Sequence, residues 1–86
     1  MNEYCGRYVY IDPSINSKKF WHLIWDLSKQ RFEAHWGRIG QRSQVTYYDH
    51  ATGIKKAKEK LKKGYVYLEG HEKEKGSNLE HFIFND

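Results

Sequence analysis

Five consecutive residues near the middle of the chain, Trp36-Gly37-Arg38-Ile39-Gly40, combine three properties that suit the binding of a polyanion. An indole can stack on a sugar or a base, and a guanidinium can hold a phosphate through two parallel hydrogen bonds. A glycine between them lets a ligand approach the backbone closely. Both side chains also have a purely structural interpretation. Trp36 shares the alternation of Phe32 and therefore qualifies as core, and an exposed Arg38 is ordinary in a strand.

Residue types that support catalysis or metal binding show no pattern of that kind. Cys5 is the single cysteine. The five histidines have neither a metal-ligand spacing nor a cysteine pair beside them: His22, His35, His50, His71 and His81. The glycines of the central segment lack the further residues that define dinucleotide-binding and phosphate-binding loops. The sequence therefore predicts a protein that is not an enzyme and that holds no metal and no cofactor.

Positive charge is concentrated in one part of the chain. Between residues 36 and 65, eight Lys or Arg side chains oppose two carboxylates, so this segment carries +6 while the whole chain carries +4. Such a basic patch favours polyanionic ligands, with an affinity that falls as salt is added. Lysines that only keep a helix soluble are the alternative explanation.

Length and composition indicate one small domain. Eighty-six residues are too few for two cores, and 16% of them are aromatic, so ring packing should supply much of the buried area. A lone cysteine forms no disulfide within the chain, and no apolar run reaches the roughly 18 residues that cross a bilayer. We expect an intracellular protein, cytoplasmic in a bacterium or nuclear in a eukaryote, with no membrane partner.

Hydrophobic alternation places the candidate residues in a strand-rich segment. Strands are predicted over Tyr8–Ile11, Phe20–Leu27, Arg31–Ile39, Gln44–Tyr48 and Tyr65–Leu68. In the second strand the odd-numbered side chains form the face that we expect to be buried. His22 and Asp26 lie on the polar face, as His35 does in the third strand. Gly37 interrupts the alternation, which indicates a bulge or a close backbone approach.

A change of period after residue 50 predicts one helix over Ala51–Lys63. Its apolar positions fall on one stripe, at i, i+3 and i+7: Ile54, Ala57 and Leu61. Lysines occupy most of the other positions. Asp49 is the predicted N-cap and Gly64 the predicted stop.

The end of the chain has a mixed character. Residues 70–78 carry charges of both signs and are predicted to form a loop. Residues 79–84 are apolar and aromatic, and they fit either a last strand of the sheet or a segment that docks elsewhere.

Several blocks of the sequence together resemble the WGR domain, which is named for its Trp-Gly-Arg signature. In chain order these blocks are Lys19-Phe20-Trp21, Trp36-Gly37-Arg38-Ile39-Gly40, Gln44, and the run Glu59-Lys60-Leu61-Lys62-Lys63-Gly64-Tyr65-Val66. The similarity covers about residues 8 to 69, and the family occurs in DNA-damage-responsive poly(ADP-ribose) polymerases and in bacterial proteins. It implies an α+β fold, a curved antiparallel β-sheet with one α-helix packed against it. The domain would span residues 1–70, with 71–86 as a charged link and an aromatic C-terminal segment.

As in those polymerases, the resemblance implies recognition of DNA ends or breaks near a 5′ phosphate. Trp36 would stack on a terminal sugar, Arg38 would contact nucleic acid or a neighbouring protein, and Lys60 would approach a phosphate. Lys18 stands where the family often has Asn, so a simple charge would replace a polar contact. The nucleic-acid-binding candidates are Trp36, Gly37, Arg38, Lys60, Lys18, Arg42 and Gln44. The alternative is a protein–protein interaction module, an adaptor or inhibitor, that binds a larger protein through the same surface or the aromatic tail.

Overall fold

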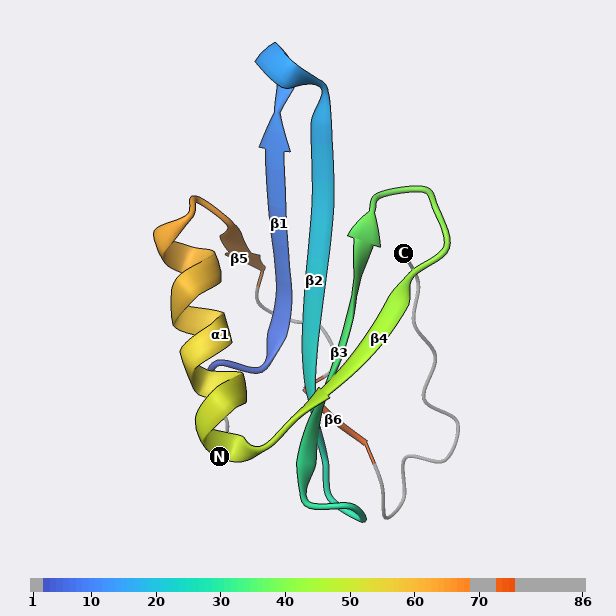
Figure 1. The fold of residues 1–86 in the computed structure, drawn as a ribbon, viewed down its shortest axis with the longest axis vertical. Coiled ribbons are helices and arrows are strands. Elements are labelled where there is room, and N and C mark those ends of the chain that lie inside the picture. The colour runs from blue at the N-terminus through green and yellow to red at the C-terminus, as the bar shows by residue number, and fades with distance from the viewer. Residues whose placement is uncertain (1–2, 69–72, 76–86) are drawn as a thin grey trace.

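One open β-sheet with a helix packed against it forms the frame of the computed structural model, which describes residues 3–68 and 73–75 (Figure 1). The elements in chain order are β1 (Gly6–Asp12), the 3-10 turn η1 (Pro13–Ile15), β2 (Ser17–Asp26), β3 (Arg31–Arg38), β4 (Gln44–Tyr48), α1 (His50–Lys62), β5 (Val66–Leu68) and β6 (Glu74–Lys75). The sheet order is β4-β3-β2-β1-β5, and every neighbouring pair on this path is antiparallel. The expected α+β class is confirmed.

The hairpin of β1 and β2 is longer than the sequence pattern predicted. Asp12 caps η1 by accepting hydrogen bonds from the backbone N–H and the hydroxyl of Ser14, and Asn16 leaves the turn with a φ of 52°. The strands pair up to the edge of this turn, where Asp12 faces Ser17. The Asp-Pro-Ser turn was therefore predicted correctly. The predicted second strand began at Phe20, because the three preceding strand residues, Ser17, Lys18 and Lys19, are polar.

Aromatic rings dominate the core between the sheet and α1. The ring centroids of Tyr8 and Trp21 lie 5.4 Å apart, and those of Trp25 and Phe32 lie 4.8 Å apart, both edge to face. Fully buried side chains complete this layer: Cys5, Leu23, Ala34 and Ala57. Offset and edge-to-face ring pairs add to the free energy gained by burial, which explains how a chain of modest hydrophobic content builds a core.

Polar residues in the middle of the opposite face of the sheet are buried, which corrects the expectation that they are open to solvent. His22, Asp26 and Glu33 are only 4%, 4% and 5% exposed. Burying such groups is favourable only where they are paired, and the Lys75 ammonium lies 2.5 Å from the Glu33 carboxylate. Alternation identified the two faces, but it could not show that polar residues on the second face are buried.

A two-residue strand also corrects the predicted loop over residues 70–78. Glu74 and Lys75 form β6, which pairs in parallel with Trp25 and Asp26 of β2. β1 leaves that edge of β2 free because its pairing ends opposite Leu23. Two charged residues give no strand signal in a sequence. Residues 79–84, expected to form a strand or a docking segment, lie outside the described residues.

The helix begins and ends one residue earlier than the predicted Ala51–Lys63, and its buried stripe differs from the predicted one. The Asp49 carboxylate accepts a hydrogen bond of 2.8 Å from the N–H of Thr52, and Gly64 follows the last turn with a φ of +103°, so both cap predictions are confirmed. Gly53 and Ala57 are buried, whereas Leu61 is 42% exposed. The prediction that Leu61 is buried is therefore wrong. The helix α1 is rotated so that Lys60, and not Leu61, faces the sheet. No helix in the described ranges reaches the length and apolarity of a membrane span.

Candidate nucleic-acid interface

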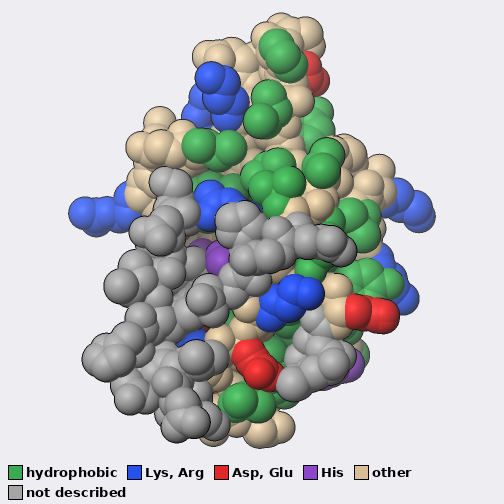
Figure 2. All heavy atoms as spheres, turned by 180° about the vertical axis from the view of Figure 1, so that it is seen from behind, with side chains coloured by type: hydrophobic (Ala, Val, Ile, Leu, Met, Phe, Trp, Pro, Cys, Tyr) green, Lys and Arg blue, Asp and Glu red, His purple; other side chains and the backbone are tan. Residues whose placement is uncertain are grey.

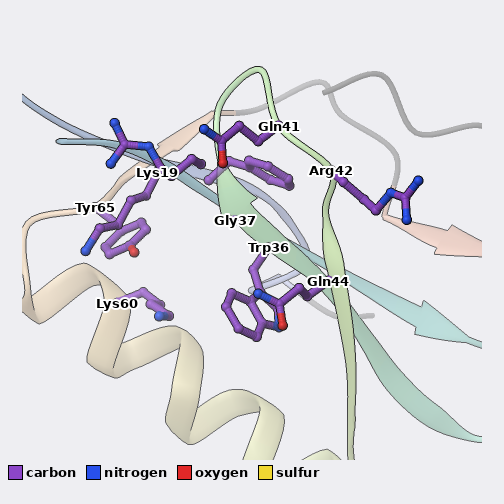
Figure 3. A pocket seen from close by; sticks show the side chains of 10 residues that line it. Lys19, Trp36, Gly37, Gln41, Arg42, Gln44, Lys60 and Tyr65 are labelled. Carbon is purple, nitrogen blue, oxygen red and sulfur yellow. The ribbon is translucent and has the colours of Figure 1, made fainter. Parts of the chain in front are cut away.

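Six of the seven candidate residues line one open cavity of about 450 Å³, which we call the first hollow (Figure 3). They are Trp36, Gly37, Arg38, Arg42, Gln44 and Lys60. The sequence pattern did not select the other lining residues, which are Lys19, Phe20, Gln41 and Tyr65. The lining comes from β2, β3, β4, the turn between β3 and β4, and the end of α1 with the residues that follow it. Segments distant in sequence thus share one surface.

Lys18 is the candidate that does not belong to this hollow. It faces Ile11 across the β1–β2 pair, and its side chain alternates with that of Lys19 to the opposite face of the sheet. Lys19 faces Arg38 in the β2–β3 pair and lines the first hollow. The signal for Lys19 was present in the sequence, since this residue shares the parity of Trp21 on the face that the alternation marked as inward.

Trp36 both packs against the core and forms part of the wall of the first hollow. Its indole is half-buried against the core and donates a hydrogen bond of 2.9 Å from Nε1 to the Thr46 hydroxyl. The same side chain lines the first hollow beside Gln44, its partner in the β3–β4 pair (Figure 3). The sheet therefore fixes the orientation of a ring that remains accessible to a ligand.

Gly37 is required by its backbone conformation. It lies opposite Phe20 in a β2–β3 register that continues without interruption, so the bulge, one of the two predicted alternatives, is wrong. Its φ of +153° is one that side-chain-bearing residues rarely adopt. Space is not the constraint, because a Cβ atom here would have no neighbour closer than the Arg42 carbonyl oxygen at 3.5 Å.

The two arginines of the first hollow differ in position. The exposed Arg38 donates a hydrogen bond of 3.1 Å from Nη2 to the carbonyl oxygen of Asn16. This contact ties the end of β3 to the turn between β1 and β2 and holds the guanidinium at the rim of the hollow. The side chain of Arg42 points away from Lys60 and Tyr65 (Figure 3). Arg38 is therefore the better placed of the two for a ligand that also reaches Lys60.

Lys60 is the most buried cation among the residues that line the first hollow. It is half-buried, and its Nζ lies 5.0 Å from the ring centroid of Tyr65 and 5.8 Å from that of Trp21. Burial, and then the positive charges of Lys63, Lys56 and Lys19, lower the pKa of Lys60 below its usual value. The ammonium thus lies in a positive field that a bound anion would relieve. This electrostatic situation favours an anionic ligand in the hollow.

A second hollow of about 300 Å³ adjoins the first. It is lined by Tyr10, Ile15, Lys19, Lys60, Lys63 and Tyr65, and it shares Lys19, Lys60 and Tyr65 with the first hollow. We call the two hollows together the basic groove. None of the described residues that line the groove is Asp or Glu. The groove thus presents cations and rings with no competing carboxylate in its lining.

Within the described ranges, no three His, Cys, Asp or Glu side chains gather in an arrangement that would hold a metal ion. Comparisons with protein-family models, with curated proteins and with solved structures gave no match for this chain. Membership of the WGR family therefore stays a prediction from the residues quoted above.

Proposed function

We propose that this protein is a non-catalytic nucleic-acid-binding module that holds its ligand in the basic groove. One observation carries the proposal: cations from three separate elements line one groove together with an indole and no carboxylate. Lys19, Arg38 and Lys60 are donors suited to phosphate oxygens, and charge-assisted hydrogen bonds of this kind are about twice as strong as neutral ones. The half-buried Trp36 offers a stacking face for a sugar or a base.

A 5′-phosphorylated DNA end is the ligand that we favour. A terminal phosphate carries about −1.5 to −2 charges and three free acceptor oxygens, more than an internal phosphodiester offers to a single cavity. The first hollow concentrates Lys19, Arg38 and Lys60 within one lining, which suits such a concentrated charge. The resemblance to the WGR domain points to the same class of ligand.

The adjacent lysines of β2 provide a matched test. Lys19→Gln removes a cation from the groove, whereas Lys18→Gln removes the same charge from the next residue on the opposite face. Fluorescence anisotropy with a 5′-phosphorylated duplex should show about tenfold weaker binding for Lys19→Gln, because a charge-assisted hydrogen bond contributes about 1.5 kcal/mol. The slope of log K against log salt should fall by about one, the value for one lost phosphate contact.

Lys18→Gln should leave the affinity within about twofold of the native value, since a remote surface charge contributes little. Negligible binding of both this duplex and a 5′-phosphorylated single strand, equal for the native chain and for Arg38→Ala, would refute the proposal. Equal weakening by Lys18→Gln and Lys19→Gln would also contradict it, because only the total charge would then matter.

A protein-interaction module is the second candidate, and the exposed apolar side chains are the observation in its favour. On the sheet face away from α1 these are Ile11, Val45, Tyr47 and Val66, which are 43% to 59% exposed. Seen from behind, hydrophobic side chains gather over the upper half of the molecule (Figure 2). A specific partner retained by the native chain and by Lys19→Gln, but lost by Val45→Lys, would favour this function over nucleic-acid binding.

A further inference from the structure

We propose that the ligand of the basic groove is a single strand that enters through its 5′-terminal nucleotide and continues across both hollows. This inference rests on the proposed function, and it names the form of nucleic acid that the groove selects. The first hollow would hold the terminal nucleotide and the second hollow the nucleotides that follow.

The two hollows adjoin each other, and each has room for a nucleotide. Lys19, Lys60 and Tyr65 line both of them, so one chain can pass from one hollow to the other along shared side chains. Their volumes of about 450 Å³ and 300 Å³ both fall within the range of roughly 300–1,000 Å³ that is typical of small-molecule sites. Each hollow can therefore accept one nucleotide-sized group.

The cations are distributed along this path. Arg38 lines only the first hollow, Lys19 and Lys60 line both, and Lys63 lines only the second. A nucleic-acid strand repeats its phosphate at every nucleotide, so cations that follow one another along a groove match a strand better than a single isolated phosphate. The second hollow consequently adds affinity only for a ligand that is long enough to reach Lys63.

The aromatic side chains favour a single strand over a duplex. The ring centroids of Tyr10 and Tyr65 lie 5.4 Å apart with 38° between their planes, and both half-buried rings line the second hollow. Trp36 supplies a further ring in the first hollow. Rings can stack only on bases whose faces are free, and a blunt duplex exposes a base face only at its terminus. Aromatic side chains in both hollows therefore fit unpaired bases.

The test uses competition against a labelled oligonucleotide bound to the full chain. The unlabelled competitors are thymidine 5′-phosphate, 5′-phosphorylated (dT)4 and (dT)8, a blunt eight-base-pair duplex with 5′ phosphates, and inorganic polyphosphate of equal charge. We expect affinity to rise from the mononucleotide to (dT)8. We also expect (dT)8 to bind at least about tenfold more tightly than the duplex or polyphosphate, because stacking contributes roughly 1–3 kcal/mol per base.

Neighbouring lysines at the end of α1 give the matched pair of variants. Lys63→Gln should weaken (dT)8 about tenfold and leave thymidine 5′-phosphate unchanged, because Lys63 lines only the second hollow. Lys62→Gln removes the same charge from the neighbouring residue. Lys62 lines a different depression, with Ala51, Ile54 and Lys55, so this variant should bind (dT)8 and thymidine 5′-phosphate as tightly as the native chain does. Circular dichroism of each variant checks that the fold is retained.

The outcomes separate this inference from the proposed function. If the duplex binds as tightly as (dT)8, and if Lys19→Gln still weakens that binding, the single-strand inference is overturned and nucleic-acid binding stays in place. If polyphosphate competes as well as (dT)8, the groove recognises charge alone and the inference fails. Equal effects of Lys62→Gln and Lys63→Gln on the affinity for (dT)8 would show that the ligand does not reach the second hollow. Absence of binding to every nucleic acid would remove both proposals.

Discussion

Gly53 of α1 lies directly against the ring of Phe32 in β3. A Cβ atom on residue 53 would stand 2.1 Å from the ring carbon Cδ2, closer than two such atoms can approach. The helix can therefore approach the sheet at this point only because residue 53 has no side chain. Two turns later the same face of the helix presents Lys60 to the Trp21 ring. The contact at Gly53 thus helps to set the position of one wall of the basic groove.

Gly53→Ala should destabilise the fold. Alanine favours a helix by about 1 kcal/mol over glycine, but overpacking a core contact costs about 1–3 kcal/mol, so a net loss is expected. Urea denaturation measures the free energy of unfolding. Lys55→Ala, at an exposed helix position, serves as the control and should change it by less than about 0.5 kcal/mol. A more stable Gly53→Ala would show that α1 is not held by this contact.

Lys60→Met should weaken nucleic-acid binding and make the stability of the fold less dependent on pH. Burial lowers the pKa of Lys60, so the folded state gives up its proton at a lower pH than the unfolded state does. The native chain should therefore gain stability relative to Lys60→Met as the pH rises through the folded pKa towards 10.5, the ordinary lysine value. Urea denaturation of both proteins at pH 7 and at pH 10 measures this difference. Anisotropy at pH 7 should show weaker nucleic-acid binding by Lys60→Met.

Two results would contradict this account of Lys60. A stability difference that stays constant from pH 7 to pH 10 would mean that the lysine titrates alike in the folded and unfolded states. Unchanged binding by Lys60→Met would mean that the ammonium does not meet the ligand.

Glu33→Gln should loosen the contact between β6 and the rest of the sheet. The Glu33 carboxylate lies 2.5 Å from the Lys75 ammonium and 2.6 Å from Nε2 of His35. Losing these charge-assisted hydrogen bonds should cost about 1–3 kcal/mol at pH 7. Amide hydrogen exchange should accelerate at Trp25 and Leu27, which donate to the carbonyl oxygens of Lys73 and Lys75.

The effect of Glu33→Gln should depend on pH. Burial alone would raise the pKa of Glu33, but hydrogen bonds from Lys75 and His35 bring it below the usual value. The stabilisation is therefore complete above the ordinary glutamate pKa of 4.5 and is lost as the pH falls through the lower folded value. Glu59→Gln is the control, since its 3.7 Å pair with Lys56 is exposed. Equal costs for the two variants would contradict the argument.

Nucleotide binding should quench the fluorescence of Trp36. This indole lines the groove, whereas Trp21 is 2% exposed and Trp25 packs edge to face on Phe32. Trp36→Phe should remove the quenching and weaken binding about tenfold, since the smaller ring keeps only part of a stacking contribution of roughly 1–3 kcal/mol. Trp25→Phe should retain both the quenching and the native affinity. Quenching that survives Trp36→Phe would place the ligand elsewhere.

The Cys5 thiol should be unreactive in the folded protein. It is fully buried, and burial, together with the charge of Glu74, raises its pKa to about 12. A thiol reagent at pH 8 should react roughly 1,000-fold more slowly with the native chain than with the chain in urea, because the thiolate is the reacting form. Similar rates under the two conditions would show that the N-terminal end of the sheet opens readily.

Local patterns in the sequence were enough to predict much of this fold. β4 begins and ends where alternation placed it, and Asp49 and Gly64 cap α1 as predicted. Alternation and capping depend on residues within a few positions of one another, so the sequence carries them directly. The Trp-Gly-Arg segment, the basic patch and the resemblance to the WGR domain marked six residues that the fold brings to one hollow, and most of them lie on a single strand or on the turn after it.

Only the tertiary structure decided which side chains lie beside one another in the groove and which polar residues are buried. The β2–β3 register places Lys19 rather than Lys18 beside Arg38, and the rotation of α1 turns Lys60 rather than Leu61 towards the sheet. β6 and the burial of Glu33 depend on a contact between residues more than forty positions apart. Register, helix rotation and long-range pairing result from packing between distant segments, and no short stretch of sequence specifies them.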